Sequence, residues 1–552
     1  MALAIYSPIV SPTMMCLPST SVHIRASLCL LWACGLLLAP CAWSQQTYYV
    51  ATNGSNAAGN GSAASPWATI EHAANALPDN GSQIVVRDGV YNGRVRLNRR
   101  FQQPATIRAE NPYRARLQEA SQQVVTSFGG ANFVLEGFEI TRPSAQATGA
   151  LVVQIQQGSA FAENITLRNN IFHDSYNNDL VKINNGCRNI VVEGNLFYNQ
   201  HGSDEHIDIN GVENVTVQDN VFFNDFAGSG RTNANDTSSY IVIKNSAALP
   251  VNRGFSVRRN VFLNWEGSAG SNFVLIGEDG QPFHEAENVV VENNLMIGNS
   301  SNAMRAACGV KGGRNITFRN NTVTGNLPSN AFAMRLNREG SNPVNQDVRF
   351  YNNIWSDPTG TMGDFSDGLP AETDGELIDN NVYWNNGQPI PSDPDVLNMS
   401  NDPRALAGNS GLTAPSGVTL PRWTGNGFPS GSASIRDEFV RLVNLYGAIG
   451  SSSAAINRSA PEQTPPDDIL GRARGGQPDI GAFEFGAGGG GVSCDVNGDS
   501  AVNIVDVQLS INQALGSTPC GSADLTQDSI CNVIDVQRVI NAALGVVCHI
   551  GP

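Results

Sequence analysis

Three acidic residues lie within five positions at the start of a predicted β-strand: Asp204, Glu205 and Asp208, in the segment SDEHIDIN. The residues that follow alternate between apolar and polar types, as in a half-buried strand. Carboxylates at this spacing repel one another unless a cation lies between them. Calcium takes six to eight oxygen ligands and suits a shallow group of carboxylates. The segment therefore predicts a calcium site.

Two other segments share this alternation, LVKIN at 180–184 and YIVIKN at 240–245. In stacked strands the apolar residues point inward, namely Val181, Ile183, Ile207, Ile209 and Ile243. Lys182, Asp208 and Lys244 then face outward from successive strands as one column, and Asp179 lies beside Glu205. The expected calcium ligands are Asp179, Asp204, Glu205 and Asp208.

A calcium ion next to a lysine suits the β-elimination of a 4-linked uronate polymer. This reaction removes the hydrogen α to a carboxylate, and a metal ion on that carboxylate stabilises the developing charge. Lys244 would accept the proton in its neutral form, whereas a free lysine has a pKa of about 10.4. Calcium and Lys182 are expected to lower the pKa of Lys244, and Asp208 to raise it. We therefore expect an alkaline optimum.

Further groups are expected on the same outer face. Lys182, Arg305 and Arg335 are predicted to bind substrate carboxylates, the arginines through bidentate contacts. The insertion DFAGSGRTNANDTSSY at 225–240 falls beside the cluster, as a loop at the wall of a cleft would. Three nearby histidines are expected to lie on the surface: His173, His201 and His206. Two plainer alternatives stay open, a solvated lysine and a purely structural calcium ion.

These segments belong to an internal repeat that runs through most of the chain. The clearest copies are NITLRNNIFHD at 164, NIVVEGNLFYN at 189 and NVTVQDNVFFN at 214. Every copy has an asparagine at the same place: Asn170, Asn195, Asn220, Asn260, Asn294, Asn321, Asn353 and Asn381. Two residues later comes an apolar side chain: Phe172, Phe197, Phe222, Phe262, Met296, Val323, Trp355 and Tyr383.

One strand copy buries only a narrow apolar row, so the copies must stack to form a core. The asparagines are expected to form a ladder, because asparagine tolerates left-handed turns and its amide can bond the same group one coil away. Regular leucines are absent, which excludes a leucine-rich repeat, and a propeller needs about four strands per ~40 residues. The predicted fold is all-β, a right-handed parallel β-helix followed by a small α-helical module.

The repeat resembles the parallel β-helix of secreted polysaccharide lyases. The opening TYYVATNGSNAAGNGSAASPWATIEHAANAL is similar to the start of bacterial β-helix proteins, which implies a first strand and a helix that caps the open coil. The segment GGQPDIGAFEFG near residue 480 is similar to their last strand. Cys187 and Cys308 precede copies four coils apart, about 19 Å at ~4.8 Å per strand. Both are therefore expected to be buried, unpaired thiols.

The acidic cluster resembles the site of the family 9 pectate lyases. The shared features are Asp204-Glu205-x-x-Asp208, an aspartate one coil earlier at Asp179, and Lys244 thirty-six residues after Asp208. The resemblance implies that the four acidic residues bind a catalytic calcium ion and that Lys244 is the base. Glu205 stands where the family has aspartate, so a uronate other than galacturonate stays open as the substrate.

Two copies of another repeat follow GAGGGG at 486–491. Their oxygen-bearing groups have the spacing of an EF-hand calcium loop that ends in Asp. The first copy has Asp495, Asn497, Asp499, the Ala501 carbonyl, Asn503 and Asp506, and the second has Asp524, Thr526, Asp528, the Ile530 carbonyl, Asn532 and Asp535. The pair resembles type I dockerin, which implies bound calcium and a cohesin-bearing scaffold or surface protein as partner. A calcium-stabilised module without a partner is the alternative.

The ends and the composition suggest the organisation of the chain. Residues 1–44 are expected to be a signal peptide, because a short apolar run ends in Ala42-Trp43-Ser44. The expected parts after it are a β-helix catalytic domain at 45–485, a Gly-rich linker at 486–493 and a dockerin-like module at 494–552. Four cysteines of the module allow three disulfide pairings: Cys494, Cys520, Cys531 and Cys548.

The net charge of −16 argues against nucleic-acid binding, and no segment after the signal is apolar enough to span a membrane. We therefore expect a secreted, calcium-dependent lyase that acts on an acidic plant or microbial polysaccharide, foremost pectate. A glycoside hydrolase on the same scaffold and a non-catalytic glycan-binding surface protein are the alternatives. Polygalacturonases need a Gly-His-Gly turn, and this sequence contains none.

Overall fold

The computed structural model describes residues 46–202, 204–249, 252–392, 394–485, 494–497, 502–518, 520–526, 530–546 and 548–549. The expected signal peptide (1–44) and linker (486–493) lie outside these ranges. So do the predicted calcium ligands Asp499, Ala501 and Asp528.

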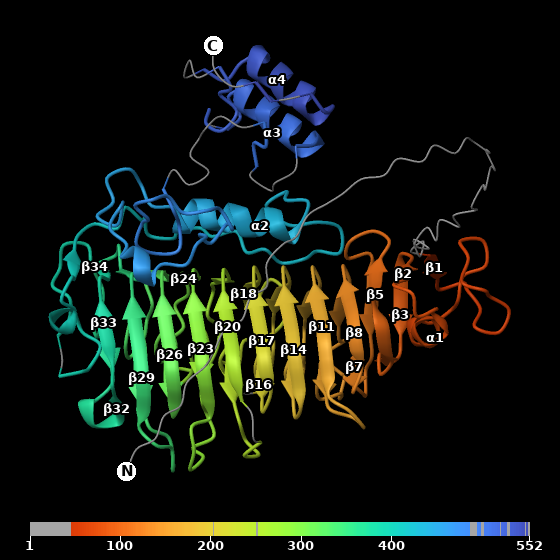
Figure 1. Ribbon diagram of the computed structural model, residues 1–552, viewed down its shortest axis with the longest axis horizontal. Coiled ribbons are helices and arrows are strands. Elements are labelled where there is room, and N and C mark those ends of the chain that lie inside the picture. The colour runs from red at the N-terminus through yellow and green to blue at the C-terminus, as the bar shows by residue number, and fades with distance from the viewer. Residues whose placement is uncertain are drawn as a thin grey trace, which may run out of the picture. The chain divides into compact units, whose positions relative to one another are not determined.

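Within the described residues, three parallel sheets surround one interior and form a parallel β-helix (Figure 1). Sheet I has thirteen strands: β1 (Thr47–Val50), β2 (Gln83–Val86), β5 (Arg100–Ala109), β8 (Ala131–Glu136), β11 (Ala162–Arg168), β14 (Cys187–Glu193), β17 (Glu213–Gln218), β20 (Arg253–Arg258), β23 (Ala286–Glu292), β26 (Gly313–Arg319), β29 (Asn345–Tyr351), β32 (Thr373–Asp374) and β33 (Leu377–Asp379). Sheet II has ten strands: β4 (Val95–Arg96), β7 (Val125–Phe128), β10 (Val153–Gln156), β13 (Val181–Asn184), β16 (Ile207–Asn210), β19 (Ile241–Lys244), β22 (Val274–Ile276), β25 (Cys308–Lys311), β28 (Met334–Asn337) and β31 (Ser366–Asp367). Sheet III has twelve strands: β3 (Gly89–Asn92), β6 (Ala115–Gln118), β9 (Glu139–Thr141), β12 (Ile171–His173), β15 (Leu196–Tyr198), β18 (Val221–Phe223), β21 (Val261–Phe262), β24 (Leu295–Gly298), β27 (Thr322–Gly325), β30 (Ile354–Ser356), β34 (Val382–Trp384) and β35 (Leu406–Ala407).

Short helices accompany the sheets. In chain order they are α1 (Ile70–Ala76), η1 (Pro370–Glu372), η2 (Met399–Asn401), α2 (Ile435–Leu442), η3 (Val443–Gly447), η4 (Pro461–Gln463), α3 (Ile504–Ala514) and α4 (Val533–Ala543). None of the helices in the described part of the chain has the length and hydropathy that crossing a bilayer requires.

The predicted asparagine ladder is confirmed, and it runs through the interior of the β-helix. Asn260 is typical: its Oδ1 accepts the backbone N–H and the side-chain amide of Asn220, at 3.1 and 3.0 Å. Its own amide donates to Val217 O and to Asn294 Oδ1. The ladder continues to Asn381, whose amide donates to Asp402 Oδ2. All eight asparagines are buried, so each bond lies in a medium where an unmade hydrogen bond is costly.

The left-handed turn, however, is one residue earlier than the ladder asparagine. Positive φ angles occur at Asn169, Gly194 and Asp219, which precede Asn170, Asn195 and Asn220. The expectation that the ladder asparagines themselves adopt this conformation was therefore wrong. The reason is geometric, because the turn must aim the next side chain inward for it to join the ladder.

The predicted apolar column two residues after each asparagine is also confirmed. Phe172, Phe197, Phe222 and Phe262 stack one coil above another, with ring centroids 4.8–5.0 Å apart. This separation equals the spacing of neighbouring strands, so identical rings on successive coils meet face to face. The interior is thus a set of regular side-chain columns.

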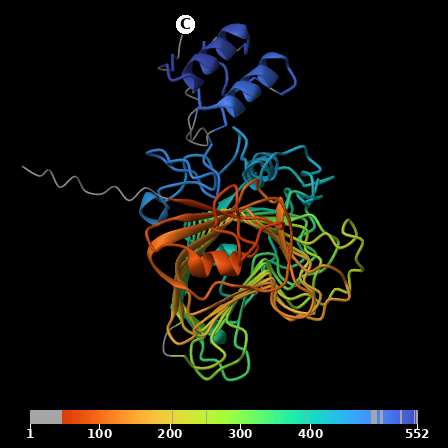
Figure 2. The same cartoon turned by 90° about the vertical axis from the view of Figure 1, so that its right-hand side faces the viewer.

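The two ends of the β-helix are built differently. At the first coil, β1 pairs with β2, and α1 buries Ile70, Ala73 and Ala74 in the main core. Figure 2 looks along the solenoid and shows α1 lying across this end, as expected for a cap.

The expected last strand near residue 480 was wrong. The described residues 480–485 form no strand, and Gly481 N and Ala482 N donate to Asn352 O and Thr322 Oγ1 on the flank of the coils. Ile480 and Ala482 instead join α2 and η3 in a second core on the outer face of sheet III. That outer face is apolar, so the segment is held there rather than in a sheet.

Two cysteine predictions have clear outcomes. Cys187 and Cys308 are buried free thiols, as expected. In the C-terminal module the structure chooses among the open pairings, with disulfides Cys494–Cys548 and Cys520–Cys531.

The C-terminal module contains two helices that each follow one predicted calcium loop. Asn503 caps α3 and Asn532 caps α4, in both cases with a capping box closed by the last loop residue, Asp506 or Asp535. The same two aspartates accept the backbone N–H groups of Asn497 and Thr526, at 3.0 and 2.8 Å. The two halves therefore repeat in structure as they do in sequence.

Candidate functional site

The candidate site lies on the outer face of sheet II, over strands β13, β16 and β19. Lys182 pairs in register with Asp208, as predicted. On the next strand Asp208 is opposite Val242, and Lys244 is opposite Asn210. Lys244 therefore faces outward, but it lies two residues further along its strand than the position opposite Asp208. The prediction of a single lysine–aspartate–lysine column was wrong by these two residues. The long inserted loop before β19 sets this register, and strand alternation alone does not report it.

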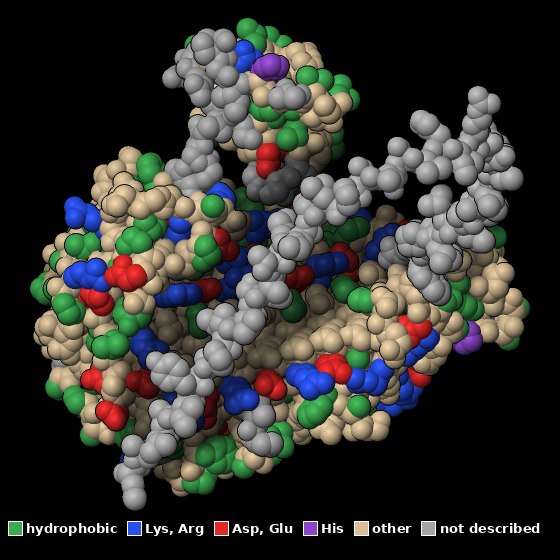
Figure 3. All heavy atoms as spheres, in the orientation of Figure 1, with side chains coloured by type: hydrophobic (Ala, Val, Ile, Leu, Met, Phe, Trp, Pro, Cys, Tyr) green, Lys and Arg blue, Asp and Glu red, His purple; other side chains and the backbone are tan. Residues whose placement is uncertain are grey.

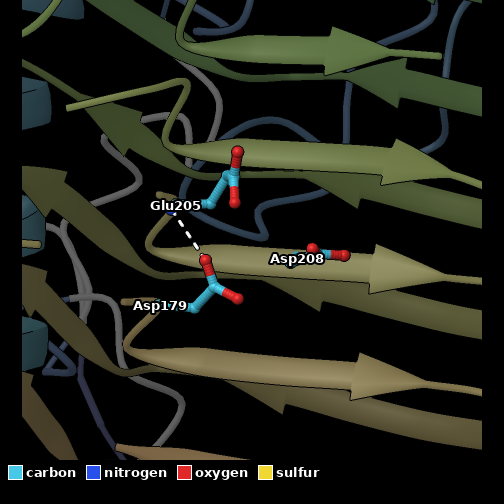
Figure 4. Close-up of side chains that lie close together, drawn as sticks. All are labelled: Asp179, Glu205 and Asp208. Atoms are coloured by element: carbon cyan, nitrogen blue, oxygen red, sulfur yellow. Dashed lines mark hydrogen bonds between the residues drawn. The ribbon is translucent and has the colours of Figure 1, made fainter. Parts of the chain in front are cut away.

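Three carboxylates meet at the start of these strands: Asp179, Glu205 and Asp208 (Figure 4). One oxygen from each lies within 4.8 Å of the other two, and all three side chains are buried. The backbone N–H of Glu205 donates to Asp179 Oδ1 at 2.9 Å, which confirms that these residues are neighbours on successive coils. The turn between sheets III and II thus brings residues 26 positions apart into contact.

Asp204 does not belong to this group. Its carboxylate is only partly buried, and among the described residues the candidate metal-binding set consists of Asp179, Glu205 and Asp208. Partial burial and the nearby charge of Asp179 still raise the pKa of Asp204 to about 7. The structure therefore brings together three of the four predicted calcium ligands and leaves the fourth at the edge.

The lysines beside the cluster offset its negative charges only in part. Burial and the charges of Asp179 and Asp208 raise the pKa of Glu205 well above its usual range. Burial and Asp179 likewise raise the pKa of Asp208, to about 6. Asp208 Oδ1 is buried and accepts no hydrogen bond from the described residues. Such an arrangement is costly without a further cation.

Lys182 lies inside the cluster. Its amine is 3.3 Å from Asp179 Oδ2 and also pairs with Asp208. Burial disfavours its charge, but Asp208 and Asp179 outweigh burial and raise its pKa. This predicted substrate-binding residue thus contacts two predicted calcium ligands directly.

Lys244 is surrounded by acidic groups. Its Nζ lies 3.6 Å from Asp208 Oδ2 and 3.9 Å from Asp279 Oδ1, and it pairs most closely with Glu278. Burial disfavours the charge, yet Asp208 and Glu278 prevail and raise the pKa of Lys244. The sequence analysis expected Lys182, together with calcium, to lower this pKa, but the surrounding acids outweigh the lowering contributions of the protein itself.

Glu278 and Asp279 were missed by the sequence analysis. They belong to the loop that follows β22, one coil beyond Lys244, where the strand pattern has already ended. The sequence does carry a signal, since GEDGQPFHE places five acidic or polar side chains directly after an outer strand.

The loop at 277–281 is held in shape by Glu285, a fully buried carboxylate. Glu285 Oε2 accepts the backbone N–H groups of Glu278 and Asp279, each at 3.0 Å, and its Oε1 accepts that of Gln281 at 3.1 Å. The amide of Asn342 donates to Oε1 at 2.9 Å. These bonds fix the backbone that presents Glu278 and Asp279 to Lys244.

The two predicted substrate-binding arginines meet further along the solenoid. Arg335 lies on β28, whereas Arg305 precedes β25 and is not on a strand of sheet II, contrary to expectation. Both guanidinium groups approach one carboxylate, Asp367, with Arg335 Nε at 3.9 Å. Partial burial and the charge of Arg335 lower the pKa of Arg305. Both arginines therefore approach Asp367, and the charge of Asp364 also favours the charged form of Arg305.

The insertion at 225–240 lies beside the cluster, as expected. Arg231 anchors it: one guanidinium nitrogen is 2.8 Å from Asp174 Oδ1, and the other donates to Ser175 O at 2.9 Å. The rings of Tyr176 and Phe226 lie near the same guanidinium. Further along, Ser238 N donates to Asp204 O at 3.3 Å, which links the loop to the acidic segment.

Two of the three histidines expected on the surface are buried. His206 stacks against Tyr240 with ring centroids 4.4 Å apart, and burial lowers its pKa to about 3. His173 lies between Glu139 and Asp174, and these acids outweigh burial and raise its pKa to about 9. His201 is partly exposed, 3.5 Å from Asp236. His173 is on β12, and alternation within so short a strand did not reveal that the chain covers the outer face of sheet III. His206 packs instead among the interior rings of Phe197 and Phe222.

One comparison with known proteins concerns the C-terminal module. Residues 493–544 match the family model described as Dockerin type I domain. A search of curated proteins found no relative.

Three solved structures illustrate the likeness of the β-helix. Pectate lyase Pel9A aligns with a TM-score of 0.47 and 18% identity, over 80% of this chain and 96% of that chain. XylC in complex with xylose aligns with a TM-score of 0.45 and 12% identity, over 80% and 98%. The A-module of mannuronan C-5 epimerase AlgE4 from Azotobacter vinelandii aligns with a TM-score of 0.38 and 14% identity, over 61% and 95%. At these identities the likeness concerns the fold alone. From its own sheets and from the family match, the chain joins a parallel β-helix to a C-terminal dockerin type I domain.

Proposed function

We propose that this protein is a secreted, calcium-dependent polysaccharide lyase that cleaves a 4-linked polyuronate, foremost pectate, by β-elimination. One observation carries the proposal: three buried carboxylates, Asp179, Glu205 and Asp208, meet on a sheet face with the amine of Lys244 3.6 Å from Asp208. A metal-binding group next to a basic amine is the pair of components that removal of a proton α to a carboxylate needs.

The residues present fit a calcium ion. Asp179, Glu205 and Asp208 would hold it, because hard oxygen donors are what calcium prefers and Asp208 Oδ1 has no other partner among the described residues. Asp204 would contribute from the edge of the group. When bound, the ion would supply positive charge that stabilises the charge developing on the substrate carboxylate.

The residues around the ion would divide the remaining work. Lys244 would accept the α-proton, and Glu278 and Asp279 would orient its amine. Lys182, Arg305 and Arg335 would bind uronate carboxylates of the substrate. With the Asp208 charge engaged by the ion, that carboxylate would attract the Lys244 proton less, and alkaline pH would then leave the amine neutral.

A glycoside hydrolase is the second candidate. It is favoured by the raised pKa of Glu205, because a protonated carboxyl beside an ionised one suits a general acid paired with a nucleophile. Glu205 is 3% exposed, which places its carboxyl away from the surface that a glycan would reach. A non-catalytic glycan-binding protein is the alternative outside the enzymes.

One experiment separates these functions. The full-length protein would be incubated with polygalacturonate and calcium at alkaline pH, and both ultraviolet absorbance of an unsaturated product and reducing ends would be followed. A lyase produces both signals, a hydrolase only reducing ends, and a binding protein neither. Parallel assays on alginate and glycosaminoglycans would identify the preferred uronate.

The dockerin type I domain extends the proposal to assembly. Its two loops would bind calcium through Asp495, Asn497, Asn503 and Asp506 and through Asp524, Thr526, the Ile530 carbonyl, Asn532 and Asp535, together with Asp499, the Ala501 carbonyl and Asp528. The partner would be a cohesin-bearing scaffold or surface protein. Co-migration of the full-length protein with a purified cohesin, present with calcium and lost with a chelator, would test this part.

A further inference from the structure

Lysine is used in only three places in this chain, although 33 residues are Lys or Arg. The three are Lys182, Lys244 and Lys311. Each is on a strand of sheet II, namely β13, β19 and β25, and each is only partly buried, with 13–22% of the side chain exposed. All lysines of the protein therefore lie on the face that carries the candidate site.

Structural charge pairs elsewhere on the β-helix use arginine instead. On sheet I the register runs Arg188, Glu213, Arg253, Glu287 and Arg314 across successive strands, with the signs alternating. Figure 3 shows such basic and acidic side chains lined up in rows. Arginine holds a carboxylate in a rigid, two-point contact, whereas lysine is a compact charge with rotatable donors. The formation of such alternating charge rows therefore does not explain the lysines on sheet II.

The three lysines are evenly spaced along the solenoid. The strand order is β13, β16, β19, β22 and β25, so a lysine occurs on every second strand. Two strands correspond to about 10 Å at ~4.8 Å per strand. Lys244 and Lys311 also share one outward position, with Gly277 between them on the intervening coil. A Cβ on Gly277 would lie 1.8 Å from Lys311 O, so the position between Lys244 and Lys311 has no room for a side chain.

The ion pair of Lys311 is open to exchange with a ligand. Its Nζ lies 3.0 Å from Glu339 Oε2, and Glu339 is on the loop after β28 with 45% of its side chain exposed. An ammonium has three donors, and this single exposed acid is the one ion-pair partner that Lys311 has among the described residues. A ligand carboxylate would therefore find a free donor on an ammonium group that is already partly buried.

We propose that Lys311 binds a carboxylate of the acidic polysaccharide two strands beyond the uronate at Lys244, so that the polymer lies along the solenoid and across the strands of sheet II. In a two-fold extended conformation, a 1,4-linked uronate chain presents every second carboxylate on the same side, and the proposal assigns two such carboxylates to Lys244 and Lys311. This subsite rests on the proposed function, since it assumes a polyuronate at Lys244. It adds a residue that specifies the length and charge of the substrate.

The test compares Lys311→Ala with Arg314→Ala, a matched loss of one cation from the sheet I row of the same coil. Both variants would be made in the full-length protein and checked for an unchanged melting temperature. Isothermal titration with polygalacturonate in calcium, and kinetics on long and very short oligogalacturonates, would be measured for each. Lys311→Ala should weaken binding and raise KM on the long substrate about tenfold, with kcat little changed, as expected for one charge-assisted hydrogen bond. The shortest substrates and Arg314→Ala should show no change.

The outcomes separate the subsite from the proposed function. If the wild type cleaves polygalacturonate and Lys311→Ala binds and cleaves it equally well, the subsite is wrong and the lyase stands. If the wild type binds the polymer without cleaving it and Lys311→Ala binds it less tightly, the lyase is wrong and the subsite stands. A wild type that neither binds nor cleaves any polyuronate overturns both. Glu339→Gln, which frees Lys311, should bind at least as tightly as the wild type; weaker binding would also overturn the subsite.

Discussion

The amine of Lys244 lies between two carboxylates from different coils, Asp208 on β16 and Glu278 after β22, and is 3.6 Å from the first. The base proposed for the reaction is therefore coupled to the proposed calcium site on one side and to a rigid loop on the other.

Replacing Lys244 tests its role as the base. Lys244→Ala and Lys244→Arg should each reduce turnover of polygalacturonate by about 100-fold or more, the usual contribution of a general base. The arginine variant keeps the positive charge between Asp208 and Glu278 but cannot give up its proton at accessible pH. It should therefore melt at the wild-type temperature while remaining inactive. Retention of more than about a tenth of the activity by Lys244→Arg would exclude Lys244 as the base.

The composition of the metal site is tested by calcium titration. Asp179→Asn should weaken binding to this site about tenfold or more, and Asp204→Asn clearly less, because only Asp179 belongs to the group of three carboxylates. Isothermal titration would be done in a background with Asp495→Ala and Asp524→Ala, so that the dockerin loops do not contribute. Equal losses in the two variants would argue against the three-residue site.

The raised pKa of Asp204 predicts how the calcium-free protein responds to pH. The folded state raises this pKa to about 7, above the usual value of about 3.9. The proton is then bound more tightly in the folded state, so the resulting stabilisation is complete below about pH 4 and is lost as the pH rises through 7. In the presence of a chelator, the melting temperature of Asp204→Asn should therefore fall less than that of the wild type as the pH is raised from 4 to 8. Parallel curves would show that Asp204 is not perturbed in this way.

Glu285 is predicted to fix the backbone of the loop at 277–281, which presents Glu278 and Asp279 to Lys244. Glu285→Gln removes a charge that accepts three backbone N–H groups and should cost about 2–4 kcal/mol of unfolding free energy. Amide exchange at Glu278, Asp279 and Gln281 should become faster, since these hydrogen bonds weaken first. Denaturant unfolding and hydrogen exchange would measure both effects.

Glu287→Gln is the control for Glu285, because Glu287 lies in the partly exposed sheet I row and should change stability by less than about 0.5 kcal/mol. Unchanged exchange at the loop in Glu285→Gln would show that the loop holds its shape without this carboxylate.

Much of the fold was predictable because it repeats. The ladder asparagines and the phenylalanine column recur once per coil, and a strand exposes its two faces by strict alternation, so both could be read from short segments. Asp179 and Glu205 were also predicted as neighbours, since only one short coil separates them. The spacing between the asparagine and the apolar side chain is the same in each copy, so a short segment is enough to reveal both columns.

Other features depended on contacts between coils of unequal length. The last strand near residue 480 failed because the apolar outer face of sheet III buries that segment, and periodicity within the segment does not show which face it will meet. The buried state of His206 has the same origin, because neighbouring coils supply the rings that stack on it.

The sequence by itself determined the parallel β-helix and the paired loop–helix units of the dockerin domain, because each is a short pattern that repeats. It also determined the presence of an acidic cluster beside lysines, because those residues lie in short neighbouring segments. Only the tertiary structure decided that Lys244 is opposite Asn210 rather than Asp208, that Asp204 stands apart from the other acids, and that Glu278 reaches Lys244. The physical reason is that register between coils is set by loops whose lengths vary, and a shift of two residues keeps every side chain on its face while changing which groups touch.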